Sequence, residues 1–173
     1  MALDPAGERA QEADVDATQS NESQSNEPRS NEPEQRLNDF GSRYAQAWCS
    51  HEPDAVAAFY STDGSLTVND GEAAVGREAI AGTARGFMSD FPDIVVTMDR
   101  MAVTDEGTIF GWTLSGTNNG PGGTGKRVRI SGYEVWQLDA DGLIAESQGH
   151  YDVAEYARQL EHGVHGAEER GRS

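Results

Sequence analysis

The sequence has little cysteine and no long apolar run, and both absences exclude classes of structure. Cys49 is the only cysteine in 173 residues, which excludes a disulfide within one chain and argues against a cysteine-based zinc site. No stretch approaches the ~18 consecutive apolar residues of a membrane-spanning helix. The first residues lack a basic region followed by an apolar run, so no secretory signal is expected and the predicted location is cytoplasmic.

Positive charge is also scarce. Lys126 is the only lysine, and 30 acidic residues against 13 basic ones give a formal net charge of −17. A surface this acidic should repel nucleic-acid phosphates and anionic lipid, so no nucleic-acid partner and no membrane partner are expected. An acidic surface poor in lysine fits a halophilic protein that stays hydrated in concentrated salt. An ordinary acidic protein encoded by a GC-rich genome would have the same composition, so both explanations stay open.

Composition divides the chain into three parts. Residues 1–36 contain no aromatic residue, few large apolar residues and three copies of a Ser-Asn-Glu unit. Such an acidic tail cannot bury enough apolar surface to offset the entropy of ordering the chain, so it is predicted to be disordered. Residues 37–163 form the predicted domain, and residues 164–173 are expected to fray at the C-terminus.

Within the predicted domain, the spacing of apolar residues changes from helical to alternating. Helical spacing predicts helices at about 37–48, 54–60, 76–89 and 153–162. A period of two predicts a short strand at 65–68 and long strands at 94–103, 108–117, 127–138 and 143–152. Helices followed by a meander of long antiparallel strands predict an α+β fold. Because long strands twist and curl, we expect a cone-shaped curved antiparallel sheet packed on the N-terminal helices around a cavity.

Five short segments follow one another in a characteristic order. They are residues 91–97 (FPDIVVT), 111–117 (GWTLSGT), 124–128 (TGKRV), 132–136 (GYEVW) and 141–146 (DGLIAE). Together they resemble the SnoaL-like polyketide cyclase family of the nuclear-transport-factor-2-like superfamily. The resemblance implies a cystatin-like α+β barrel with a pocket for a small molecule, no cofactor, and a homodimer in which a second copy covers the exposed sheet.

The resemblance also implies a catalytic residue. Family members that cyclise their substrates carry out an intramolecular aldol condensation, served by an acid/base carboxylate near the end of the last strand. The matching residue is Asp152. Strand alternation places it on one face with Glu146, Gln148 and His150. If this face lines the cavity, Asp152 is the predicted acid/base group, His150 assists it and Gln148 orients a carbonyl group. The alternative is that the same face lies outside and is wetted by solvent.

Glu134 is a separate candidate because it lies in the middle of an apolar strand face. A carboxyl group there is costly unless it is neutral or paired, and burial would raise its pKa. Ketosteroid isomerase, of the same superfamily, binds an oxyanion with a first-helix tyrosine and a protonated carboxylic acid. The resemblance places Tyr44 and Glu134 near those positions, whereas Val68 stands where that enzyme has its general base. An ion pair of Glu134 with Arg127, Arg129 or an arginine of a helix is the open structural alternative.

Two functions are consistent with these residues. In the first, aromatic side chains that include Trp48 and Trp112 line a pocket for an apolar carbonyl compound, and acid/base groups catalyse cofactor-free cyclisation, isomerisation or hydrolysis. In the second, the chain is a non-catalytic ligand-binding or dimerisation module of the same fold. The positions of its Asp, Glu and His residues match no recognisable metal spacing, so no metal site is expected.

Overall fold

The computed structural model describes residues 19–164, with side chains from residue 32 onward. The chain divides after Asp39 into two compact units. Within the first unit the backbone is helical from Gln19, and Arg36 Nη1 lies 3.8 Å from Glu32 Oε1 in an exposed ion pair. The second unit, which begins at Phe40, contains every strand of the described sheet.

Helix α2 (Gln19–Cys49) begins well before the expected start near residue 37. Residues 19–36 are therefore helical, where the composition predicts disorder. Once a turn of helix has formed, each further residue adds one hydrogen bond, so extending a helix costs far less than starting one. The predicted disorder of residues 1–18 and the fraying of residues 165–173 lie outside the described residues. None of the helices in the described part of the chain is long and apolar enough to cross a membrane.

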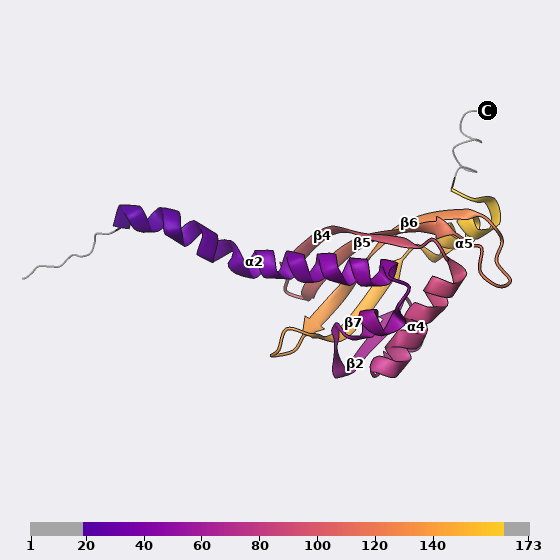
Figure 1. Ribbon diagram of the computed structural model, residues 1–173, viewed down its shortest axis with the longest axis horizontal. Helices are drawn as coiled ribbons and strands as arrows, with labels where there is room; N and C mark the ends of the chain where they lie inside the picture. The colour runs from indigo at the N-terminus through magenta and orange to yellow at the C-terminus, as the bar shows by residue number, and fades with distance from the viewer. Residues whose placement is uncertain (1–18, 165–173) are drawn as a thin grey trace, which may run out of the picture. The chain divides into compact units, whose positions relative to one another are not determined.

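The remaining elements follow the predicted order closely. They are α3 (Pro53–Ala57), β2 (Tyr60–Val68), β3 (Ala74–Val75), α4 (Arg77–Asp90), β4 (Val95–Thr104), β5 (Gly107–Thr117), β6 (Arg127–Leu138), β7 (Ile144–Tyr151) and α5 (Val153–His162). Figure 1 shows them in chain order from indigo to yellow. Strand β2 begins earlier than predicted, and the two-residue strand β3 is an addition that is too short to give a pattern in the sequence.

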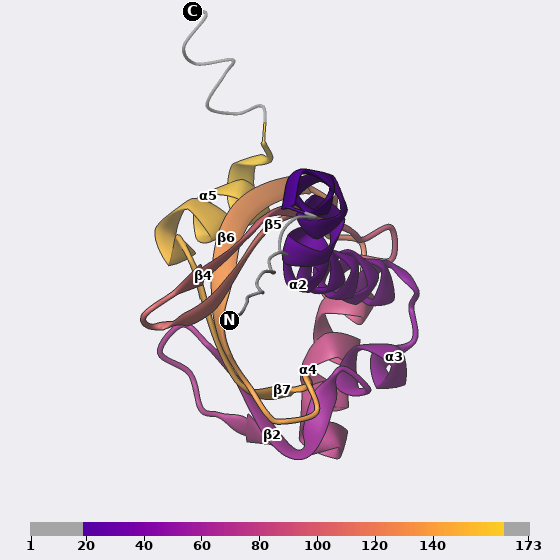
Figure 2. The same ribbon diagram turned by 90° about the vertical axis from the view of Figure 1, so that its left-hand side faces the viewer.

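The strands of the described residues form one six-stranded sheet in the order β3-β2-β7-β6-β5-β4. Strands β4 to β7 are an antiparallel meander, as predicted, whereas β2 pairs in parallel with β7. Figure 2 shows that the sheet is strongly curved and that α3 and α4 lie on its concave side. The predicted α+β class with a curved sheet packed on helices is confirmed.

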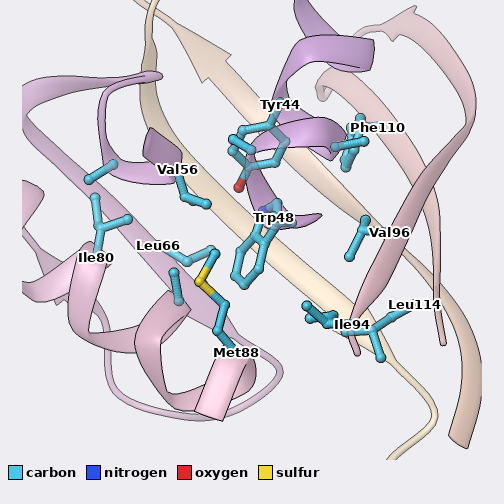
Figure 3. Packing of buried hydrophobic residues seen from close by; sticks show 14 of the residues in the cluster. Tyr44, Trp48, Val56, Leu66, Ile80, Met88, Ile94, Val96, Phe110 and Leu114 are labelled. Atoms are coloured by element: carbon cyan, nitrogen blue, oxygen red, sulfur yellow. The ribbon is translucent and has the colours of Figure 1, made fainter. Parts of the chain in front are cut away.

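The core fills the concave side of the sheet with aromatic and aliphatic side chains. Figure 3 shows Tyr44 and Trp48 of α2 lying near Phe110 of β5 and Leu66 of β2, with Met88 of α4 close by. Tyr44 is completely buried and Phe110 is 1% exposed. Each such side chain contributes about 1.5–3 kcal/mol by leaving water, so this cluster fixes the helices against the curved sheet.

Candidate functional site

The curved sheet and the helices enclose a cavity. The space open to the centres of water-sized molecules is about 60 Å³, enough for several waters or one small organic molecule. Among the described lining residues, Glu134 is the only one with a carboxyl group. The lining consists of Trp48, Leu66, Val68, Phe87, Val96, Phe110, Trp112, Leu114, Ile130, Glu134, Gly149, Tyr151 and Tyr156. It is therefore an apolar pocket with one acidic group, a composition suited to a mostly apolar ligand.

The Glu134 carboxyl group is held by a network of neutral donors. Its Oε1 accepts hydrogen bonds from Trp136 Nε1 at 2.7 Å and from Ser147 Oγ at 2.8 Å. The Tyr44 hydroxyl donates to Oε1 at 3.1 Å and lies 3.4 Å from Oε2. A second phenol, Tyr60, lies 2.7 Å from the Tyr44 hydroxyl. The three donors to Oε1 fix the carboxyl group, while Oε2 has only the longer contact with Tyr44.

The strand register explains why this carboxyl group borders open space. Glu134 of β6 pairs with Phe110 of β5 and with Gly149 of β7. Gly149 has no side chain, and a Cβ atom built there would lie 3.6 Å from Glu134 Cγ. The next inward position on β6 is Gly132, where a Cβ atom would overlap the Trp112 ring and a backbone carbonyl oxygen. Gly149 thus leaves room beside Glu134 that a larger side chain would fill, whereas the space over Gly132 is taken by the Trp112 ring.

Burial determines the protonation of this network. Glu134 is only 7% exposed, and its burial raises the carboxyl pKa above the ordinary value of 4.5, although the donors from Trp136, Ser147 and Tyr44 act in the opposite direction. Burial, followed by the nearby Glu134 charge, holds the pKa of the Tyr44 and Tyr60 hydroxyls well above 10.0. Both phenols therefore stay protonated at neutral pH, and Glu134 is the most acidic group of the network.

The structure brings together two of the predicted site residues, Tyr44 and Glu134. Tyr44 does not line the cavity, so it reaches a ligand only through the carboxyl group that it positions. The alternative of an ion pair between Glu134 and an arginine is wrong, because hydroxyl and indole groups are its described partners. Arg127 Nη1 instead lies 3.4 Å from Asp93 Oδ2 at the surface. Trp48 and Trp112 both line the cavity, where the sequence placed them.

The polar line on β7 lies on the other face of the sheet, which corrects the expectation that it faces the cavity. Asp152 is exposed and begins helix α5, where its Oδ1 accepts a hydrogen bond from the Glu155 N–H at 3.0 Å. His150 stacks on a tyrosine of β6 with ring centroids 4.9 Å apart. Gln148 Nε2 donates to a backbone carbonyl in the turn after β2 at 3.1 Å. None of the three lines the cavity.

A bulge and the size of the inward residues account for this error. Ile144 is completely buried, but the pairing of β6 with β7 skips Ala145, so strand alternation changes face at this point. Beyond the bulge the inward positions are Ser147, Gly149 and Tyr151. Small residues on a strand face, considered individually from the sequence, do not indicate a binding site. In a close-packed protein, however, such residues are what leaves a cavity open.

Five polar contributors to the site were not among the predicted site residues. Tyr60, Trp136 and Ser147 belong to the Glu134 network. Tyr151 and Tyr156 line the cavity, and burial raises the pKa of both hydroxyls, that of Tyr156 to about 12. The signal that could have found two of them is the run of inward positions at 147, 149 and 151, once the bulge is allowed for.

The described residues contain no group of three or more His, Cys, Asp or Glu side chains placed to hold a metal ion. The half-buried thiol of Cys49 instead contacts backbone, with Sγ 3.2 Å from the Val96 N–H nitrogen and 3.4 Å from the Ala45 carbonyl oxygen. The polar groups among the lining residues are one carboxyl group, two indoles and two phenols. This set suits proton exchange and hydrogen bonding with a neutral organic ligand.

Comparison with known proteins agrees with this architecture. A family model described as a SnoaL-like domain matches residues 42–147, more than half of the chain. No curated protein matches. Among solved structures, a hypothetical protein with a ketosteroid isomerase-like fold from Catenulispora acidiphila, in complex with trimethylamine, has a TM-score of 0.62 and 17% identity. The alignment covers 70% of this chain and 91% of that one.

Two further solved structures have the same fold. The putative SnoaL-like polyketide cyclase from Jannaschia has a TM-score of 0.57 and 16% identity, covering 70% of this chain and 90% of that one. The protein TsrD from Streptomyces laurentii has a TM-score of 0.62 and 21% identity, covering 72% and 93% of the two chains. At these identities the likeness concerns the fold, and the chemistry must be argued from this chain's own residues.

Proposed function

Because this chain belongs to the SnoaL-like domain family, and its cavity holds one buried carboxyl group, we propose that it binds a small, largely apolar carbonyl compound. Glu134 exchanges a proton with the carbon next to the carbonyl group. The observation that carries the proposal is the position of Glu134 as the only carboxyl among the described lining residues of an otherwise apolar cavity. The predicted acid/base function thereby passes from Asp152 to Glu134.

The arrangement of the carboxyl group supports this chemistry. Three donors hold Oε1, so the side chain is fixed before a ligand arrives. Oε2 takes the proton, the electrons of the C–H bond form a carbon–carbon double bond, and the carbonyl electrons move to oxygen. When the enolate is conjugated with a second double bond, return of the proton to the far carbon is an isomerisation. In an aldol cyclisation the enolate carbon attacks a second carbonyl group, and the alkoxide formed there takes the proton back from Glu134.

The raised pKa of Glu134 gives the reaction a characteristic pH dependence. Proton abstraction needs the carboxylate, and burial, which raises the Glu134 pKa, moves its formation to higher pH than in an exposed glutamate. The exchange rate therefore rises as the pH increases through that raised value. A base with a pKa closer to neutrality is also a stronger proton acceptor than an exposed glutamate.

A non-catalytic binding module is the second candidate. It is favoured by the same three hydrogen bonds to Oε1, since a fully satisfied buried network also stabilises a fold without any chemistry. The two functions differ in one measurable property. A binding module holds the carbonyl compound and releases it unchanged, whereas an enolising site exchanges hydrogen on the neighbouring carbon.

Exchange of α-hydrogen in D₂O, followed by NMR with cyclohexanone, acetophenone and α-tetralone, tests the proposal. We expect the wild-type protein to accelerate exchange of at least one ketone over the buffer rate. Glu134→Gln keeps the size and an acceptor oxygen for the three donors but cannot take the proton. We expect it to lower the rate by about 10²–10⁴-fold, the usual contribution of a positioned acid/base group.

Asp152→Asn is the matched control, since it removes the carboxylate that the family pattern indicates. Asparagine caps a helix as well as aspartate does, so α5 keeps its first hydrogen bond. We expect the exchange rate of this variant to equal that of the wild type. A rate that falls with Asp152→Asn and survives in Glu134→Gln would contradict the proposal, and binding without exchange would favour the non-catalytic module.

A further inference from the structure

Trp112 carries a hydrogen-bond donor that the protein leaves unused. Its side chain lines the cavity, and its Nε1 atom is buried without an acceptor among the described residues. A buried donor with no partner costs about 1–3 kcal/mol, so proteins rarely keep one. The indole of Trp136, by comparison, donates to Glu134 at 2.7 Å. Trp48, Tyr151 and Tyr156 also line the cavity outside the Glu134 network. Among the described lining residues, Trp112 is the one whose polar atom is buried without a hydrogen-bond partner.

The strand register places this donor beside Glu134. Trp112 pairs with Gly132, and Phe110 pairs with Glu134, so Trp112 and Glu134 are diagonal neighbours on the inward face of adjacent strands. The Cα atoms of such neighbours lie about 7–8 Å apart on the two strands, so two long side chains at these positions can contact the same ligand. Because Gly132 has no side chain, the Trp112 ring extends over it toward β7. Its ring centroid lies 6.0 Å from that of Tyr151.

We propose that the Trp112 Nε1–H binds the carbonyl oxygen of the ligand whose α-carbon faces Glu134. This inference rests on the proposed function and completes it, because enolisation needs a donor for the oxygen as well as a base for the carbon. Glu134 Oε2 takes the α-proton, the C–H electrons form the double bond, and the carbonyl electrons move to the oxygen that Trp112 holds. The reverse steps return the proton, so no oxidant or second reactant is needed.

The geometry also defines the ligand class. The carbonyl oxygen must lie near Trp112 of β5 while the α-carbon lies near Glu134 of β6. This arrangement suits a compact ketone whose enolate is planar. The aromatic rings of Phe110 and Tyr151 also line the cavity, and they suit a flat apolar ligand. A free carboxylic acid is a poor ligand, because its negative charge would face Glu134 in an apolar enclosure.

The first test is the variant Trp112→Phe, which keeps an aromatic ring and removes the donor. With the ketone that wild type exchanges best, we expect kcat for exchange to fall about 10²-fold, as for one donor to a developing oxyanion, and KM to change less than threefold. Tyr133→Phe, on the outer face of β6, is the control and should exchange at the wild-type rate. Equal kcat values for wild type and Trp112→Phe would overturn the inference while leaving Glu134→Gln to decide the proposed function separately.

The second test does not depend on turnover. The chain has three tryptophans, so an NMR spectrum of the ¹⁵N-labelled protein has three indole N–H signals, and the one missing in Trp112→Phe belongs to Trp112. We expect 4-fluorophenol, a planar analogue of an enol, to move this signal downfield. Movement of another indole signal, with that of Trp112 unchanged, would overturn the inference. If wild type exchanges no ketone and binds no phenol, the proposed function fails and the inference fails with it.

Discussion

Two glutamates of this chain each accept several side-chain hydrogen bonds, yet the pKa of one is raised and that of the other is lowered. Glu134 accepts from Tyr44, Trp136 and Ser147, and burial raises its pKa. Glu155 accepts two bonds from the Arg158 guanidinium and one from an amide side chain. These bonds lower the pKa of Glu155 to about 2.

The difference lies in the solvent and in the charge of the donors. The guanidinium beside Glu155 is charged and the carboxylate stays hydrated, so the ionised form is favoured. The donors to Glu134 are neutral, and the surrounding cavity holds no described cation to offset the lost hydration. Counting hydrogen bonds therefore does not predict the protonation of a carboxyl group, whereas burial together with donor charge does.

The largest expected effect comes from truncating each glutamate. Glu134→Ala leaves Tyr44, Trp136 and Ser147 without their acceptor in the core, and we expect a loss of about 3–5 kcal/mol in the free energy of unfolding. Glu155→Ala leaves its partners in contact with water, so the loss should be much smaller. Urea unfolding of both variants measures the difference. Equal losses would show that the buried network stabilises no more than a surface one.

A smaller effect is expected from filling the space in front of Glu134. A methyl group at Gly149 would meet Glu134 Cγ and the Thr67 carbonyl oxygen at 3.6 Å, which is ordinary contact. Gly149→Ala should therefore fold, yet weaken ketone binding by about tenfold by occupying the cavity, a cost of about 1.4 kcal/mol. Gly82→Ala, on an exposed part of α4 with no atom within 4 Å of the added methyl, is the control. Unchanged binding by Gly149→Ala would place the ligand elsewhere.

Removing one donor to Glu134 tests how far the hydrogen bonds offset the effect of burial on its pKa. Ser147→Ala deletes a hydrogen bond that favours the ionised form of Glu134. We expect a loss of about 1 kcal/mol in stability and a further rise in the Glu134 pKa. The pH at which ketone exchange is half-maximal should then move upward. A downward movement would mean that Ser147 acts on the neutral form instead.

The pH dependence of stability is the smallest of the expected effects. Because burial raises the pKa of Glu134, the folded protein holds this proton at pH values where the unfolded chain has released it. Above the unfolded value, near 4.5, wild-type stability should therefore fall relative to Glu134→Gln until the folded carboxyl group also ionises. Below that range the difference between the two proteins should be constant. Urea unfolding of both proteins across pH 3–8 measures this difference in stability. An increase in wild-type stability relative to Glu134→Gln as the pH rises would contradict the prediction.

The sequence predicted the fold much better than the site. Periodicity located β6 and α5 at their observed bounds, because long amphipathic elements carry strong patterns. It also placed Glu134 on an inward face. It could not reveal the bulge at Ala145, which depends on pairing between strands, and so it assigned Asp152 to the cavity. The homodimer, the cytoplasmic location and adaptation to salt stay predictions.

The central claim is that burial beside an apolar cavity makes Glu134 hold its proton more tightly than a carboxyl group in water does. An NMR titration of the ¹³C-labelled side-chain carboxyl groups measures Glu134 and Glu155 in one sample. The account predicts a midpoint above 4.5 for Glu134 and one of about 2 for Glu155. A Glu134 midpoint at or below 4.5 would contradict it, because the carboxyl group would then be hydrated or paired and the apolar cavity would not enclose it.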